Sequence, residues 1–153
     1  MYVVSSVPGD MFTQMRTALV QERILAFTDT PDIAFSPTLT HRDVLEFATI
    51  DGARACALDH KVGSLTPGKQ ADIVLMRTDQ VNVAPVVDPV ATVVMCADTS
   101  NVDTVFIAGR IVKQNGQLLR VDMPRLLDRL NGARDHLLSN AGVIPKWILS
   151  RRD

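Results

Sequence analysis

The chain has 153 residues, 46% of them hydrophobic, which suits one domain with room for a small second lobe and excludes wholesale disorder. With 16 basic and 17 acidic residues the formal net charge is -1, so there is no broad electrostatic reason to expect nucleic acid or an anionic membrane as a partner. No apolar run approaches the roughly 18–20 residues of a bilayer crossing and no signal peptide is recognisable, so a cytoplasmic location is expected.

The first part of the chain is predicted to be mostly helical. A short strand is expected to end near Ser5, before a turn at proline and glycine. Asp10 stands at an N-cap position, and the apolar residues that follow it predict a helix over about 10–27. The proline-containing stretch that follows the helix is predicted to be a loop.

A second helical region is predicted around residues 41–58. Thr40 to Asp43 fits a capping box and starts a helix over about 41–49. Asp51-Gly52 is expected to interrupt it, and the alanine-rich "ARACAL" to form a short helix that packs close to its neighbour. Cys56 and Cys96 both lie in apolar runs, so buried free thiols are expected rather than a disulfide.

From residue 61 the pattern favours strands. A short strand is predicted around Val62 and Leu65, followed by a type II turn at Thr66–Lys69. The nearly continuous apolar run "ADIVLM" predicts a strand buried on both faces. For "VATVVMCA", periodicity does not decide between a strand and a short helix.

The last third of the chain has the clearest signals. "VDTVFIAGRIVK" predicts a hairpin turning at Ala108-Gly109, and Asn115-Gly116 predicts a further turn and strand. A final helix is predicted to start near Asp122 and to end at Gly142. Its apolar stripe comprises Leu126, Leu127, Leu130, Ala133, Leu137 and Leu138.

The residues themselves indicate no catalytic, cofactor-binding or metal-binding site. His41 is predicted to be exposed at a helix start, His60 to be exposed at a helix-to-strand junction, and His136 to lie near a helix C-terminus. No H-x-H, H-E-x-x-H or C-x-x-C pattern occurs, and there is no nucleophile elbow or phosphate-binding loop. Asp10 could be a metal ligand, but the helix-capping interpretation is favoured.

Three stretches nevertheless resemble a known family. "ATIDGARACALDHKVGSLTPGKQADIVLM" and "DPVATVVMCADTSNVDTVFIAGRIVKQNGQLL" are similar, in order and spacing, to the C-terminal portion of the amidohydrolase superfamily. "GDMFTQMRTAL" resembles the helix that follows the last barrel strand. The branch with the most similar motifs is that of cytosine deaminase and chlorohydrolase-like enzymes, which includes guanine deaminase, adenosylhomocysteine deaminase and triazine hydrolases.

The resemblance implies a TIM barrel joined to a small β-sandwich, and a zinc or iron ion that activates water for attack on a heterocyclic ring carbon, breaking a C–N or C–Cl bond. The family's metal-binding histidines lie upstream of every segment matched here. Its metal-binding aspartate would fall within Met1 to Val4, where no acidic residue stands. No residue of the family's catalytic set is therefore carried over to this chain.

The expected fold is mixed α/β and too short for a complete barrel, which needs about 250 residues. Residues 1–60 are predicted to correspond to the last strand-helix elements of the barrel. Residues 61–153 are predicted to supply the C-terminal strands of the sandwich and to end in a helix. No cofactor is expected in this chain itself.

Three functional hypotheses follow. The first is a truncated amidohydrolase-family protein, inactive alone and self-associating through apolar helix faces and unpaired strand edges. The alternative is a subunit-like module that completes a separate chain carrying the metal-binding histidines. The third is an autonomous enzyme that uses an unfamiliar site with Asp10 and His60.

Overall fold

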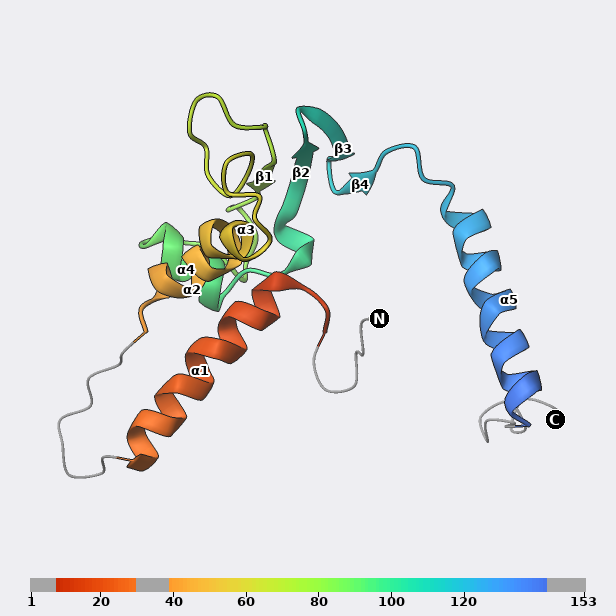
Figure 1. Cartoon of the computed structure of the whole chain (residues 1–153), viewed down its shortest axis with the longest axis horizontal. Coiled ribbons are helices and arrows are strands. Elements are labelled where there is room, and N and C mark those ends of the chain that lie inside the picture. Colours follow the sequence, from red (N-terminus) through yellow and green to blue (C-terminus); the bar gives the residue numbers. More distant parts are fainter. Residues whose placement is uncertain (1–7, 30–38, 143–153) are drawn as a thin grey trace. The chain divides into compact units, whose positions relative to one another are not determined.

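The computed structural model describes residues 8–29 and 39–142, and the chain divides between Leu119 and Arg120 into two compact units. The first unit contains a long helix, several short helices and a small sheet, and the second contains another long helix (Figure 1). None of the helices in the described part of the chain combines the length and apolar character that a bilayer crossing requires.

The first helix, α1 (Met11–Asp29), begins where the sequence predicts it. The backbone N–H of Thr13 donates to Oδ1 of Asp10 at 2.9 Å, and the Thr13 hydroxyl donates to Oδ2 at 2.8 Å. Asp10 therefore satisfies one of the free amides at the helix start, which confirms its N-cap role. The strand predicted to end near Ser5 and most of the loop predicted before Thr40 lie outside the described residues.

Helix α2 (His41–Glu46) starts with the predicted capping box. Thr40 Oγ1 accepts from the Asp43 amide at 3.3 Å, and Asp43 Oδ2 accepts from the Thr40 amide at 2.7 Å. The predicted interruption at Asp51-Gly52 is wrong, because the chain continues through the π-helix η1 (Phe47–Asp51) into α3 (Gly52–Ala55).

Gly52 explains why the helix does not break there. Its backbone angles are helical, with φ -59° and ψ -43°, and a Cβ at this position would meet the carbonyl oxygen of Phe47 at 3.0 Å. The glycine thus makes room for the wide π turn and does not end the helix. The helix of "ARACAL" is also shorter than predicted and ends at Ala55.

The strand predicted around Val62 and Leu65 is not formed. Residues 61–72 are a loop, closed by a bond from the Gln70 amide to the Lys61 carbonyl (2.8 Å) and one from Lys69 Nζ to the Val62 carbonyl (3.2 Å). The predicted type II turn is confirmed within it: Gly68 has φ +94°, and the Lys69 amide donates to the Thr66 carbonyl at 3.2 Å.

The sheet has four antiparallel strands in sequence order: β1 (Ile73–Met76), β2 (Val102–Ile107), β3 (Arg110–Gln114) and β4 (Gln117–Leu118). Both predicted turns are confirmed. Ala108-Gly109 and Asn115-Gly116 have positive φ at both residues, which matches the twist of tightly connected antiparallel strands. The carboxylate of Asp72, just before β1, accepts from the Ala108 amide at 2.6 Å and so holds the first turn.

Strand β1 is not buried on both faces, contrary to the prediction. Val74 is 54% exposed and Leu75 is 49% exposed. The prediction treated the apolar run as a strand covered by helices on both sides, whereas β1 is the edge strand of a small antiparallel sheet. Cys56 and Cys96 are free but exposed, also contrary to prediction, because each lies at the C-terminal cap of a short helix.

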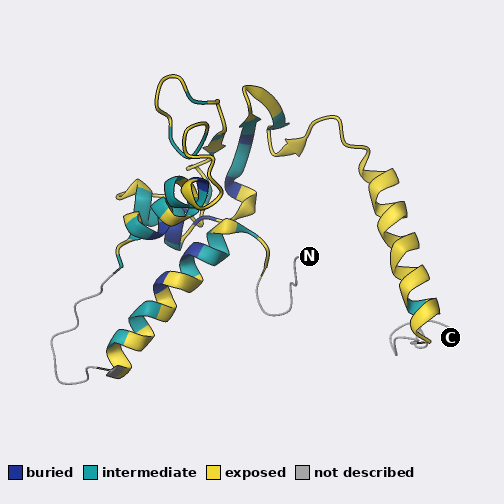
Figure 2. Ribbon diagram, in the orientation of Figure 1, coloured by how far each residue is buried: buried dark blue, intermediate teal, exposed yellow. Residues whose placement is uncertain are grey.

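The ambiguous segment after Asp88 is helix α4 (Pro89–Met95). Asp88 decides this, because its carboxylate accepts from the Val90 amide at 2.9 Å and from the Ala91 amide at 3.2 Å, with proline at the first helical turn. Figure 2 shows the buried residues gathered where α1, α2 and α4 meet. This core consists of Met15, Leu19, Val44 and Val94.

The second unit contains α5 (Met123–Ala141), which has the predicted ends. The Asp122 carboxylate accepts from the Arg125 amide at 3.0 Å, and Gly142 closes the helix with φ +63°. None of its described residues is buried, and Figure 2 shows the helix exposed along most of its length. Its exposed leucines are Leu126, Leu127, Leu130 and Leu137.

Candidate functional site

The three histidines lie on separate elements. His41 is the first residue of α2 and is half-buried, more enclosed than predicted. His60 is exposed in the turn after α3, as predicted. His136 is exposed on α5, where its Nε2 lies 2.9 Å from Nδ2 of Asn140.

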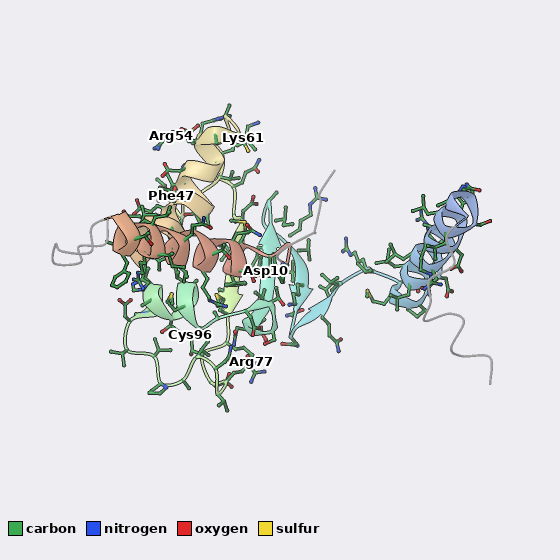
Figure 3. The ribbon with its side chains drawn as sticks, turned by 90° about the horizontal axis from the view of Figure 1, so that it is seen from below. Asp10, Phe47, Arg54, Lys61, Arg77 and Cys96 are labelled. Atoms are coloured by element: carbon green, nitrogen blue, oxygen red, sulfur yellow. The ribbon has the colours of Figure 1, made fainter. Side chains whose placement is uncertain are left out.

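Asp10 and His60, the pair considered for an unfamiliar catalytic site, lie apart. Figure 3 shows Asp10 at the start of α1 and Lys61, the neighbour of His60, at a separate place on the molecule. The pKa of Asp10 lies below its ordinary value, chiefly because the Thr13 backbone N–H donates to the carboxylate. This carboxylate stabilises the helix start.

A polar cluster surrounds the buried Asn101, which no motif had singled out. Its side chain is completely buried, and its Nδ2 donates to Gln80 Oε1 and, at 3.2 Å, to Asn82 Oδ1. Its Oδ1 accepts from Asn82 Nδ2 at 2.9 Å and from the Asp98 amide at 2.8 Å. Asn101 thus joins the loop after β1 to the chain entering β2, and Asp98–Asn101 is the capping box of the 3-10 helix η2 (Thr99–Asn101).

Arg16 links this region to α1. Its Nη2 donates to the Ala97 carbonyl at 2.7 Å and its Nε donates to the Val94 carbonyl at 3.3 Å, at the C-terminal end of α4. A cation is favoured there because the helix end leaves unpaired carbonyls and partial negative charge. The pKa of nearby Asp98 is lowered mainly by hydrogen bonds from Ser100, with a smaller contribution from the Arg16 charge.

Replacing Arg16 by alanine is expected to lower the free energy of unfolding by about 2 kcal/mol, because two carbonyls lose a charged donor. Arg42→Ala is the matched control. Among the described residues its guanidinium pairs with Glu46, at 3.4 Å, and its side chain is 73% exposed, so a loss below about 0.5 kcal/mol is expected. Urea unfolding of the full chain measures both losses. Equal losses would contradict the role assigned to Arg16.

The C-terminal half of α1 carries an apolar surface that the described residues leave open. Val20, Ile24 and Phe27 follow one another at helical spacing and are 39%, 59% and 72% exposed. Two shallow hollows run along this face and share Val20 and Ile24. We call this surface the α1 groove. It is lined by Arg16, Thr17, Val20, Gln21, Arg23, Ile24, Leu25, Phe27 and Thr28.

Comparison of the sequence with models of known protein families gives a match over residues 3–112. The matching family is the amidohydrolase family. The chain belongs to the amidohydrolase family. This confirms the resemblance seen in the sequence motifs, and the mixed α/β class with a small antiparallel sheet is confirmed with it.

Several relatives of this amidohydrolase-family chain are deaminases. It is 36% identical over 105 residues to a 5-methylthioadenosine/S-adenosylhomocysteine deaminase of Acetivibrio thermocellus, a match that covers 68% of this chain and 24% of the relative. It is 35% identical over 109 residues to a 5'-deoxyadenosine deaminase of Methanothermobacter thermautotrophicus, covering 71% of this chain and 23% of the relative.

Solved structures agree in fold. An adenosine deaminase from Xanthomonas campestris with bound zinc matches 85% of this chain, and 28% of its own, with a TM-score of 0.74 and 29% identity. An atrazine chlorohydrolase from Arthrobacter aurescens matches 79% of this chain and 25% of its own, with a TM-score of 0.68 and 22% identity. The chain therefore spans about a quarter of the length of the relatives it matches.

The described residues do not fit the zinc ion of such a relative. Within residues 8–29 and 39–142, no three His, Cys, Asp or Glu side chains come together as metal ligands. The polar side chains of Asn101 and Arg16 join elements to one another.

Proposed function

We propose that this chain is the C-terminal share of a metal-dependent deaminase of adenosine-like nucleosides, and that it is inactive without the rest of the fold. The observation that carries the proposal is the 36% identity to a 5-methylthioadenosine/S-adenosylhomocysteine deaminase over 105 residues. In this proposal, residues 1–60 correspond to the last elements of the barrel, and residues 61–153 to the sandwich strands and a closing helix.

The chain's own contribution is structural. Asp10 fixes the start of α1, Arg16 ties that helix to α4, and Asn101 ties the loop after β1 to the chain entering β2. A zinc ion like that of the adenosine deaminase relative would activate water in the assembled enzyme, and none of the described residues is assigned to hold it. The alternative in which the metal-holding part is a separate polypeptide is supported by the α1 groove, which the described residues leave open.

Co-expression tests this proposal. The full 153-residue chain is produced together with the Acetivibrio thermocellus deaminase from which the matched quarter has been removed. Zinc content and ammonia release from 5-methylthioadenosine are then measured for the pair and for each polypeptide alone.

The expected result is zinc and ammonia release from the pair, and neither from the 153-residue chain alone. Zinc-dependent ammonia release by the chain alone would refute its inactivity. A pair that holds no zinc and releases no ammonia would refute its role as the missing share of the enzyme.

A further inference from the structure

We propose that Asn115 is a site of spontaneous deamidation, at which the side-chain amide is replaced by a carboxylate without the help of an enzyme. The chain contains two Asn-Gly pairs, Asn115-Gly116 and Asn131-Gly132. This pair of residues favours the reaction, because glycine has no Cβ to obstruct the approach of its own backbone nitrogen to the asparagine side chain. The inference concerns one turn of this chain and does not depend on the proposed function.

The first observation is the openness of the turn between β3 and β4. Asn115 and Gly116 are both exposed, and nothing lies within 4 Å of a Cβ built on Gly116. Within the described part of the chain, the Asn115 side chain has no hydrogen-bond partner. The turn is therefore open to water, which the reaction consumes, and the side chain that reacts is not held in place.

The second observation is the hydrogen bond that restrains the attacking nitrogen. The Gly116 amide donates to the Asp103 carbonyl on β2 at 2.9 Å, so the turn must open before this nitrogen can attack. Beyond the turn, β4 has two residues, and the bond from the Leu119 amide to the Val112 carbonyl (2.8 Å) holds its far end. A short strand at the edge of a sheet opens locally at much lower free energy than the whole fold.

Asn131 is less favourable for the reaction. Its Oδ1 accepts from Nη1 of Arg134 at 3.1 Å, which restrains the side chain. Gly132 lies in the interior of α5, where its backbone nitrogen belongs to the ladder of helical hydrogen bonds. More than one turn of helix must unfold before that nitrogen is free, whereas Asn115 requires the release of a two-residue strand. The two pairs therefore differ in what the backbone must give up.

The reaction balances with water as its co-reactant. The Gly116 nitrogen attacks Cγ of Asn115, so an N–Cγ bond forms, the Cγ–Nδ2 bond breaks, and ammonia leaves with the proton that the nitrogen gives up. Water then opens the cyclic imide at one of its two carbonyl groups. Opening at the main-chain carbonyl gives isoaspartate, and opening at the side-chain carbonyl gives aspartate. Because the nitrogen must lose its proton, the reaction is faster at higher pH.

The modification changes the turn as well as its charge. An isoaspartate carries the main chain through its side chain and so lengthens the backbone of a tight turn. Strand β4 pairs with β3 through Gln117, opposite Gln114, and a longer connection opposes this register. The new carboxylate also makes the formal net charge of -1 one unit more negative. Deamidation therefore loosens β4, the last strand before the second unit.

The test follows the intact chain during incubation in mildly alkaline buffer. Trypsin cuts after lysine and arginine, so it places Asn115 in the peptide Gln114–Arg120 and Asn131 in the peptide Leu130–Arg134. Mass spectrometry of each peptide measures the mass gain of an amide-to-acid change, and a digest made at the start of the incubation corrects for deamidation during digestion. The free peptide Gln114–Arg120 is incubated in the same buffer as a reference.

Two variants at Leu119 test the role of turn opening. Leu119→Pro removes the amide that bonds to the Val112 carbonyl, and Leu119→Ala keeps it, so the pair differs in that hydrogen bond and leaves Asn115-Gly116 intact. Circular dichroism checks that both variants fold. Asn115→Gln is the chemical control, because its side chain closes a larger ring much more slowly.

The intact chain is expected to gain mass at Asn115, more slowly than the free peptide, and Asn115→Gln to abolish the gain. Leu119→Pro should deamidate at Asn115 about 2- to 10-fold faster than Leu119→Ala, with the rate at Asn131 the same in both. No gain at Asn115 while the free peptide converts would overturn the proposal. Equal rates in the two Leu119 variants, or a faster gain at Asn131 than at Asn115, would overturn the control by the turn.

Discussion

Replacement of Asn101 by alanine is expected to lower the free energy of unfolding by about 3–4 kcal/mol, in urea unfolding of the full chain. The side chain is completely buried, and its amide bonds to Gln80, Asn82 and the Asp98 backbone. Alanine would remove four hydrogen bonds of this side chain, each of which contributes about 0.5–1.5 kcal/mol.

Thr99→Ala is the control for this prediction. Thr99 is an exposed member of the same 3-10 turn, so its replacement should change the free energy of unfolding by no more than about 0.5 kcal/mol. Comparable losses for the two variants would show that the turn itself, and not the amide cluster, holds this region together.

The second large effect is expected at Gly63, the glycine that follows Lys61-Val62. Its φ is +90°, and a Cβ there would lie 2.7 Å from Cβ of Ala53 and 3.1 Å from the carbonyl oxygen of Thr49. Gly63→Ala therefore combines backbone strain with overlap against the helical segment η1–α3. Left-handed strain of about 1–2 kcal/mol and overpacking of similar size predict a loss of about 3 kcal/mol.

Gly68 offers a matched comparison within the same loop. Its φ is +94°, but nothing lies within 4 Å of the added Cβ, so Gly68→Ala should cost only the backbone strain of about 1–2 kcal/mol. Adding Ala53→Gly to Gly63→Ala should recover part of the loss, because it removes the atom that the new methyl group meets. Equal losses at Gly63 and Gly68, with no recovery in the double variant, would contradict the close approach.

Gly63 and Gly68 lie in the same loop, but only the role of Gly68 could be predicted from the sequence. The turn at Thr66–Lys69 was predictable, because proline and glycine stand at the positions that a type II turn requires. Gly63 stands in an apolar context that resembles a strand. Its actual role depends on Ala53, a residue on another element.

In the candidate site, too, some interactions could be predicted from the sequence and others could not. The N-cap at Asp10 was predictable because capping is a local interaction between residues three positions apart. The amide cluster of Asn101 with Gln80 and Asn82 was not, because its members are about twenty positions apart in the chain. The burial of Cys56 and Cys96 was predicted wrongly for a related reason, since an apolar run does not tell which of its residues face the core.

The sequence alone determined the helix starts, the tight turns, the order of the strands in their hairpins and the family, because each depends on residues close together in the chain or on motifs in a fixed order. The tertiary structure decided that the chain runs through Gly52 as a π-helix and that β1 lies at a sheet edge. Within the described part of the chain, it also decided that the α1 groove is left open. These features depend on which surfaces meet in space, and the free energy of burial is set by that meeting rather than by any local pattern.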